Sequence, residues 1–281
     1  MSAFKLPAGK VQISFSCGRT SALMLHEILA ANGDLCPDSV RVVFANTGRE
    51  MPETLDFAKE VQAQWGVHIT WVEFDLNNPP RQRFRVVSHN SASRAGEPFD
   101  QLIEWKRVLP NALMRYCTRD LKIWPARDFL FSLGWNNWVN CVGLRADEMS
   151  RVKRPDKNKE WTRWHPLADA GITKEDVSEF WRRQPFDLKL DTVNGVTIEG
   201  NCDGCFLKSE AKLASLCRKF PDRFAWWEAH ESRMSAARGD FGVFNKSRPL
   251  DKLRGFVESQ GDWIFEMQDA LCQADGGECI E

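Results

Sequence analysis

Several features that would assign this 281-residue chain to a special class are missing from its sequence. No apolar run approaches the roughly 20 residues that a membrane-spanning helix needs. The first segment, MSAFKLPAGK, contains no apolar signal-peptide core. The net charge is −1, so no overall positive charge favours nucleic acid as a partner. We therefore expect a soluble, cytoplasmic globular protein that does not bind a membrane.

The sequence also lacks the two common glycine-rich phosphate-binding motifs, GxxxxGK[ST] and GxGxxG. Cysteine, in contrast, is plentiful, with nine residues. Because this number is odd and no secretory signal is present, a disulfide framework is not expected. The cysteines are instead expected to be buried, catalytic or metal-binding.

Apolar strands that alternate with amphipathic helices dominate the first part of the chain. The expected strands are Lys10–Ser16, Val40–Ala45, His68–Phe74 and Trp138–Leu144. The expected helices between them are Ser21–Ala31, Glu53–Trp65 and Leu121–Leu133. This alternation predicts an α/β fold with a parallel twisted sheet, right-handed crossovers and flanking helices. The segment Asn77–Ala95, with paired prolines and scattered arginines, predicts a long irregular loop.

Helical patterns take over toward the C-terminus. A short helix capped by Thr173 is expected over Lys174–Trp181. Later helices are expected over Ser209–Lys219, Asp222–Met234, Leu250–Ser259 and Trp263–Leu271. We therefore predict an α/β nucleotide-binding domain over residues 1–200, followed by a helical C-terminal region over residues 201–281.

The segment SFSCGRTS is the first candidate for a binding site. Small and hydroxyl-bearing residues surround the point where the first strand becomes a helix: Ser14, Ser16, Gly18, Thr20 and Ser21. Unpaired backbone amides at a helix N-terminus can bind an anion without a lysine. Gly18 would allow close approach of the backbone and an unusual φ angle. Taken alone, the residues favour a structural helix cap over a phosphate site.

This turn resembles the SGGxxS loop of the PP-loop ATP pyrophosphatase superfamily, with Cys17 where the first glycine usually lies. A second segment, NTGREMPETLDF, resembles the segment after the second strand in the phosphoadenylyl-sulfate (PAPS) reductase family. Three more resemblances follow in the same order as in that family: RYCTRDLKIWP, VGLRADE and HPLADAGITKEDVSEFW. Together these segments run from about residue 10 to about residue 210, and they are most similar to compact, phage-borne members of the family.

The resemblance implies an adenine nucleotide, PAPS or ATP, bound across neighbouring strand ends. The nucleotide-binding residues that it implies are Ser14, Ser16, Gly18, Arg19, Thr20, Ser21, Asn46, Thr47, Gly48, Gly143 and Arg145. The implied catalytic residues are Arg145, Lys122 and Cys279. Arg145 follows a strand and could clamp a phosphate or sulfate group. Asp147 and Glu148 could hold Mg²⁺ on a nucleotide or belong to a solvated loop.

The segment NCDGCFLK places Cys202 and Cys205 in CxxC spacing, which zinc, iron–sulfur and dithiol redox sites all use. Resemblance to adenylyl-sulfate reductases and to tRNA-thiolating relatives implies a [4Fe–4S] cluster on Cys117, Cys202 and Cys205, with zinc as the alternative. The fourth ligand is open between none and one of three cysteines: Cys217, Cys272 or Cys279. PAPS reductases carry their nucleophilic cysteine in a C-terminal ECGLH segment, of which GGECIE here matches only two residues.

Three functions remain open at this point. A PAPS reductase would attack the sulfonate with a thiolate, release sulfite and receive electrons from a thioredoxin-like donor. An ATP pyrophosphatase-type sulfurtransferase would adenylate an acceptor such as tRNA and then transfer sulfur to it. A non-catalytic nucleotide-binding protein would retain only the fold. The incomplete ECGLH segment favours the second function, whereas the NTG, PET and GLR segments favour the first. The sequence does not indicate an oligomeric state.

Overall fold

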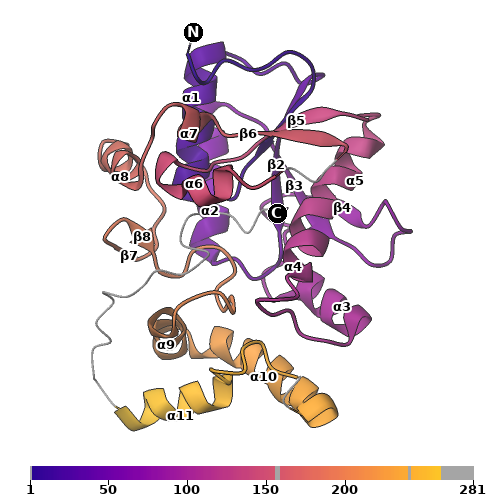
Figure 1. Cartoon of the computed structure of the whole chain (residues 1–281), viewed down its shortest axis with the longest axis vertical. Coiled ribbons are helices and arrows are strands. Elements are labelled where there is room, and N and C mark those ends of the chain that lie inside the picture. The colour runs from indigo at the N-terminus through magenta and orange to yellow at the C-terminus, as the bar shows by residue number, and fades with distance from the viewer. Residues whose placement is uncertain (1, 156–158, 240–241, 261–281) are drawn as a thin grey trace.

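The computed structural model describes residues 2–155, 159–239 and 242–260 (Figure 1). Within these residues, six strands form one sheet in the order β4-β3-β2-β1-β5-β6. The strands are β1 (Val11–Ser14), β2 (Val40–Asn46), β3 (Ile69–Phe74), β4 (Phe84–Val87), β5 (Trp138–Cys141) and β6 (Trp161–Trp164). All neighbouring strands run parallel except the antiparallel pair β3–β4. The predicted α/β fold with a mainly parallel sheet is confirmed.

Strand β1 occupies the position that matters most for ligand binding. It pairs with β2 on one side and β5 on the other, so that Ile13 lies opposite both Val42 and Cys141. The chain runs outward from β1 through β2 and β3, and later returns to the other side of β1 with β5. Strand order therefore reverses between β1 and β5. In open α/β sheets, ligands bind beyond the carboxyl ends of the strands at such a reversal.

Helices cover both faces of the sheet because strand side chains alternate between the faces. On β2, Phe44 belongs to the core that also contains α1 (Arg19–Asn32), α2 (Pro52–Trp65) and α8 (Lys174–Arg182). The neighbouring Val43 belongs to a second core, with residues of α5 (Trp124–Ser132). Both faces are thus buried, which explains the nearly continuous apolar run VRVVFA.

Two predictions about local structure need correction. The segment predicted as an irregular loop, Asn77–Ala95, contains β4, which the longer strand β3 stabilises by antiparallel pairing. The helix predicted over Leu121–Leu133 begins earlier and includes a π-helical stretch, so that α4 (Tyr116–Thr118), η1 (Arg119–Ile123) and α5 follow one another. The remaining short elements are α3 (Glu97–Lys106), η2 (Ala146–Glu148), α6 (Met149–Val152), α7 (Pro166–Asp169), β7 (Thr192–Val193) and β8 (Val196–Thr197).

The C-terminal part is helical, as predicted, with α9 (Glu210–Lys219), α10 (Pro221–Arg238) and α11 (Leu250–Gln260). These helices lie together at the end of the molecule opposite the N-terminus (Figure 1). They share a third core with α3, in which Leu102, Leu216 and Trp227 are buried. The helix expected over Trp263–Leu271 lies outside the described residues. No helix in the described part of the chain has both the length and the apolar character needed to cross a bilayer.

Candidate functional site

The turn between β1 and α1 is a compact, internally hydrogen-bonded loop. The Oγ of Ser21 accepts from the Ser16 amide at 3.2 Å, contacts the Ser16 hydroxyl at 3.0 Å and donates to the Gly18 carbonyl at 3.0 Å. The unusual φ angle expected at Gly18 is found instead at Cys17, which has φ 60°, whereas Gly18 has φ −102°. Cys17 is fully buried, so its side chain points into the core. The turn thus carries its backbone strain one residue before the glycine.

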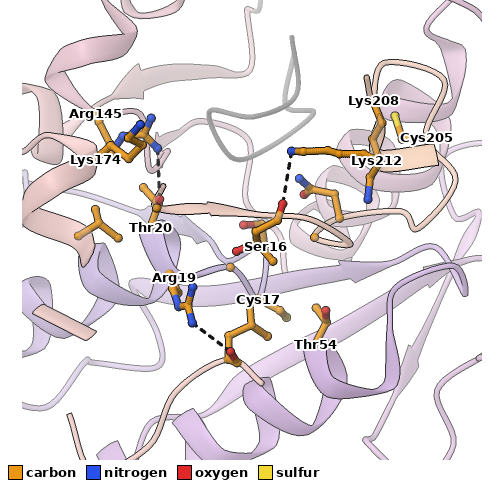
Figure 2. Close-up of a pocket in the computed structure, with 17 residues that line it drawn as sticks. Ser16, Cys17, Arg19, Thr20, Thr54, Arg145, Lys174, Cys205, Lys208 and Lys212 are labelled. Atoms are coloured by element: carbon orange, nitrogen blue, oxygen red, sulfur yellow. Dashed lines mark hydrogen bonds between the residues drawn. The ribbon is translucent and has the colours of Figure 1, made fainter. Parts of the chain in front are cut away.

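A pocket opens above this turn (Figure 2). Its wall includes the turn residues Ser16–Thr20, Thr54 of α2, and residues of the 195–212 segment. Five cationic side chains contribute to it: Arg19, Arg145, Lys174, Lys208 and Lys212. No aspartate or glutamate is among the residues that line it, within the part of the chain that the structure describes. The wall is therefore suited to an anion.

Lys208 and Lys212 are unusual because both are buried, at 4% and 3% exposure. The Lys208 ammonium donates to the Ile198 carbonyl at 3.0 Å, and that of Lys212 donates to the Thr197 carbonyl at 3.4 Å. Burial lowers the pKa of Lys208, against the opposing influence of Cys205 and Asp203. Burying an ammonium group is costly unless negative charge compensates it. An anion in the pocket would supply that charge.

Two further wall residues carry groups that could interact with a ligand, the Thr54 hydroxyl and the Cys205 thiol. The hydroxyl of Thr54, which is 2% exposed, has no hydrogen-bond partner within the described structure. A buried hydroxyl normally has a partner, so one at a pocket wall indicates room for a ligand atom. Cys205 is 8% exposed and lies beside Lys208 at the same end of the pocket (Figure 2). The pocket thus combines positive charge, a hydroxyl group and a thiol.

Both arginines predicted to bind nucleotide already bind carboxylates. Arg145 forms a two-point contact with Asp147, at 2.9 and 3.0 Å, and lies 3.4 Å from Glu148. Arg19 forms a similar contact with Asp187, at 2.7 and 2.6 Å. These guanidinium groups line the pocket, but much of their charge is balanced within the protein. The same pairing occupies Asp147 and Glu148, the residues considered for Mg²⁺.

The second predicted turn, Asn46–Gly48, does not line this pocket. Asn46 is buried and donates to Glu73 at 2.6 Å, while the Thr47 amide donates to Glu50 at 2.9 Å. A Cβ atom on Gly48, where φ is +79°, would lie 3.0 Å from Pro98. This turn is therefore closely packed against Glu50, Glu73 and Pro98. The two turns do not form one shared pocket in the described structure.

Four other predicted residues lie near the site without facing into it. The Ser14 hydroxyl donates to Asn140 at 2.8 Å between β1 and β5, and Ser21 closes the turn. The backbone of Gly143 lies close to that of Ser21: a Cβ atom added at Gly143 would lie 3.4 Å from the Ser21 Cα atom. The Lys122 ammonium lies 3.8 Å from Glu50, on the side of the second turn.

The predicted cluster ligands are Cys117, Cys202 and Cys205. In the described residues, no group of three or more histidine, cysteine, aspartate or glutamate side chains is arranged to hold a metal ion. The Sγ of Cys202 lies 3.3 Å from the Thr47 hydroxyl, whereas Cys205 lines the pocket. Cys117 on α4 and Cys202 both pack against the C-terminal core. The [4Fe–4S] cluster and its zinc alternative stay predictions, and Cys272 and Cys279 lie outside the described residues.

The loop between Cys202 and Cys205 is held firmly in place. Asp203 is fully buried and accepts from Arg49 at 2.8 Å, from the Trp227 indole at 2.7 Å and from Arg223. Burial lowers the pKa of Arg49, although the charge of Asp203 opposes this shift. A Cβ atom at Gly204 would lie 2.3 Å from the ring of Trp227, so only glycine fits there. Both residues between the cysteines are thus determined by packing and charge.

The sequence predictions missed three pocket cations: Lys174, Lys208 and Lys212. Lys208 ends the motif NCDGCFLK directly before the N-cap Ser209, and Lys212 lies in the first turn of α9. Ser209 caps this helix and accepts from the Lys212 amide at 3.4 Å. The spacing was a usable signal, but nothing in the local sequence shows that this helix start faces the β1 turn.

The sheet reversal and the cationic pocket together define an α/β protein with a positively charged pocket beyond its central strand. The sequence model of the family described as "Phosphoadenosine phosphosulfate reductase domain" matches residues 10–189. The chain therefore belongs to the phosphoadenosine phosphosulfate reductase family. A protein of Escherichia phage lambda, described as "Uncharacterized nin region protein ORF290", is 30% identical over 213 residues, which cover 73% of this chain and 69% of that protein.

Two solved structures show a more distant similarity. PAPS reductase from Candida auris, in a phosphate complex, matches with a TM-score of 0.40 at 16% identity, over 69% of this chain and 88% of that chain. The U34-tRNA thiolase NcsA from Methanococcus maripaludis, with its [4Fe–4S] cluster, matches with a TM-score of 0.34 at 10% identity, over 91% of this chain and 74% of that chain.

Proposed function

We propose that the protein is an enzyme that binds an adenine nucleotide carrying a sulfonate group, such as PAPS, and reduces this group to sulfite. The observation that carries the proposal is the pocket above the β1–α1 turn. Among the residues that the structure describes, its wall contains five cations and no carboxylate, although two of the cations, Arg19 and Arg145, pair with carboxylates outside the wall. Cys205 is part of the same wall. A sulfonucleotide brings anionic oxygens together with a sulfur atom that a thiol can attack.

The two ends of the pocket suggest how such a nucleotide lies. Thr20, Arg145 and Lys174 lie toward one end, and Cys205, Lys208 and Lys212 toward the other, with Ser16 between them (Figure 2). The amides at the start of α1 and the Ser16 hydroxyl are suited to a phosphate group. The two buried lysines are suited to the terminal sulfonate. This orientation brings the sulfonate sulfur to the thiol end of the pocket.

A second candidate is the ATP-dependent sulfurtransferase, in which the same pocket holds ATP and the acceptor is a nucleic acid such as tRNA. A separate groove favours it. Lys106, Arg238 and Lys246 line this groove, and no acidic residue does so in the described part of the chain. Leu113, at its edge, is 96% exposed.

Product analysis with two labelled nucleotides distinguishes the candidates. The reduced protein is incubated anaerobically with sulfur-labelled PAPS and, separately, with phosphorus-labelled ATP and tRNA. We expect sulfite from PAPS and no pyrophosphate from ATP. Pyrophosphate without sulfite would identify the sulfurtransferase instead. Binding without either product would leave only a nucleotide-binding protein, and absence of binding would overturn the proposal.

A glycine substitution tests the location of the pocket. A Cβ atom on Gly18 would lie 3.6 Å from the Ser16 hydroxyl oxygen, an ordinary contact, and its φ of −102° suits alanine. Gly18→Ala is therefore expected to fold normally and to bind PAPS at least tenfold more weakly, a loss of about 1.4 kcal/mol. Gly255→Ala on α11, where no atom lies near the added methyl group, is the matched control. Unchanged calorimetric affinity in a folded Gly18→Ala protein would exclude this turn as the phosphate site.

A further inference from the structure

The two cysteines of the CxxC segment lie in different surroundings. Cys205 lines the anion pocket next to the ammonium group of Lys208 (Figure 2). Cys202 is not part of the pocket wall. Its Sγ lies 3.3 Å from the Thr47 hydroxyl, which in turn contacts Glu50 at 2.9 Å. The Cys205 thiol can therefore contact a ligand in the pocket, whereas the Cys202 thiol lies outside the pocket wall.

The backbone keeps these two cysteines close together. The Cys205 amide donates to the Cys202 carbonyl at 3.3 Å, which closes a four-residue β-turn. The first and last Cα atoms of such a turn lie within about 7 Å. Disulfide-linked cysteines have Cα separations of about 4.4–6.8 Å, so the turn provides suitable spacing for a disulfide. Asp203 and Gly204, fixed by Arg49 and Trp227, hold the turn in position.

We propose that Cys205 and Cys202 act as a redox dithiol that reduces the bound sulfonate, an inference that rests on the proposed function. The Cys205 thiolate attacks the sulfonate sulfur, the bond from sulfur to the phosphate oxygen breaks, and the nucleotide leaves as its phosphate. Cys205 then carries an S-sulfonate. The Cys202 thiolate attacks the Cys205 Sγ, a disulfide forms and sulfite leaves. Two thiols are oxidised to one disulfide while the sulfonate is reduced by two electrons.

The pocket provides what this sequence of steps requires. The leaving phosphate oxygen needs no proton, and the cations around it stabilise its charge. Lys208 and Lys212 lie at the same end of the pocket as Cys205, where the thiolate would attack the sulfonate. The same two cysteines cannot act as free thiols and as cluster ligands at once. The dithiol is therefore an alternative to the predicted cluster on these two cysteines.

A single-turnover experiment tests the dithiol. The full chain is reduced, freed of reductant under anaerobic conditions and mixed with PAPS. We expect one sulfite per chain, the loss of two thiols and a Cys202–Cys205 disulfide in the peptide map. Cys202→Ser should stop with an S-sulfonate on Cys205, detected by mass, and release little sulfite. Cys205→Ser should bind PAPS with normal affinity and form neither product. Cys205→Ala replaces it if the serine variant does not fold.

Cys217→Ser serves as the matched control, because Cys217 is also buried but lies in the C-terminal core. It should release sulfite like the unsubstituted protein. Sulfite release by Cys205→Ser at the normal rate would overturn the dithiol, as would an S-sulfonate on Cys279. Iron and sulfide that are bound to the purified protein and lost in Cys202→Ser would also overturn it. Sulfite that is released only after an external thiol is added would refute the dithiol alone. No sulfite even with an external thiol, or no PAPS binding at all, would refute the proposed function.

Discussion

At the scale of single residues, Cys17 shows how the phosphate-type turn departs from glycine. Its φ of 60° lies in the left-handed region, which costs a residue with a Cβ atom about 1–2 kcal/mol. Glycine, which has no Cβ atom, adopts this conformation without such a cost. Here the side chain is fully buried with Val11, Ile13 and Leu25 in the core of the sheet. Packing of the sulfur atom offsets the strain of the backbone.

This balance predicts an unusual order of stability for two variants. Cys17→Ala keeps the strain and loses the packed sulfur atom, whereas Cys17→Gly loses the packing and relieves the strain. We expect the alanine variant to be less stable than the glycine variant by about 1 kcal/mol, although glycine is normally the less stable of the two. Urea unfolding of both variants measures the difference. An alanine variant that is as stable as the glycine variant would mean that the turn is not strained.

Arg145 leads to a prediction about stability rather than about affinity alone. Its guanidinium pairs with Asp147 and with Glu148, and burial raises the pKa of Glu148 although Arg145 and Arg151 oppose the shift. Removing one partner of a buried ion pair costs about 3 kcal/mol or more. Arg145→Ala should therefore unfold at clearly lower urea concentration. Arg151→Ala, which removes a more exposed partner of Glu148, should have a smaller effect. Equal stability of Arg145→Ala and the unsubstituted protein would show that this guanidinium is not structural.

At the scale of elements, a buried carboxylate joins the C-terminal helices. Glu231 of α10 accepts from the Phe244 amide at 2.9 Å and from the Leu250 amide at 2.5 Å, at the start of α11. Burial raises the pKa of Glu231 above its usual 4.5, although these two amides lower it. The folded protein therefore holds this proton more tightly than the unfolded chain does.

The raised pKa has a definite consequence for pH dependence. The stability that Glu231 contributes is complete below pH 4.5 and falls as the pH rises through the folded-state pKa. Glu231→Gln has no such titration. Relative to this variant, the unsubstituted protein should therefore lose stability between pH 4.5 and neutral pH. Urea unfolding of both proteins across this interval gives the difference directly. A constant difference would mean that the pKa of Glu231 is the same in both states.

The sequence correctly predicts the elements whose own residues show an apolar run or an amphipathic pattern. The runs VQIS and VRVVFA are apolar, and each is followed by an amphipathic helix, so β1, α1, β2 and α2 were predictable. Strands β4 and β6 have only four residues each and are stabilised by pairing with β3 and β5. Such pairing depends on distant residues, which a local pattern does not show.

The same distinction applies to the site. The β1–α1 turn could be predicted because all of its residues are contiguous. The approach of Lys208 to Ser16 could not, because 192 residues separate them and only the folded chain brings them to one pocket. Arg145 and Asp147 are only two residues apart, but the local sequence does not show whether Arg145 pairs with Asp147 or binds a ligand. The sequence thus indicates the β1–α1 turn, and tertiary structure brings the lysines to it.

At the scale of the whole molecule, the pocket links parts of the chain that are far apart in sequence. Its wall combines the β1–α1 turn, α2, α8, the β7–β8 hairpin and the start of α9. The buried lysines come from the segment that leads into the C-terminal helices, which form their own core. A ligand that contacts both the turn and these lysines would therefore stabilise the sheet and the helices together.

Ligand-induced stabilisation makes this link measurable. At a PAPS concentration one hundred times the dissociation constant, binding should contribute about 2.7 kcal/mol. For a chain of this size, that contribution raises the melting temperature by about 5–10 °C. The shift should shrink as salt is added, because the cations in the wall supply much of the binding free energy. Adenosine, which has no phosphate or sulfonate group, should produce almost no shift.

Lys212→Met gives this measurement an internal check. Replacing a buried ammonium group by an apolar side chain of similar length is expected to leave the melting temperature of the free protein unchanged or raised. The same change removes one of the cations at the sulfonate end, so the PAPS-induced shift should fall to less than half. Opposite effects on free and bound protein are expected only if the lysine is retained for the ligand. A variant that is strongly destabilised without ligand and shows a normal shift with PAPS would assign Lys212 to folding, and would leave the sulfonate end of the pocket without one of its two buried cations.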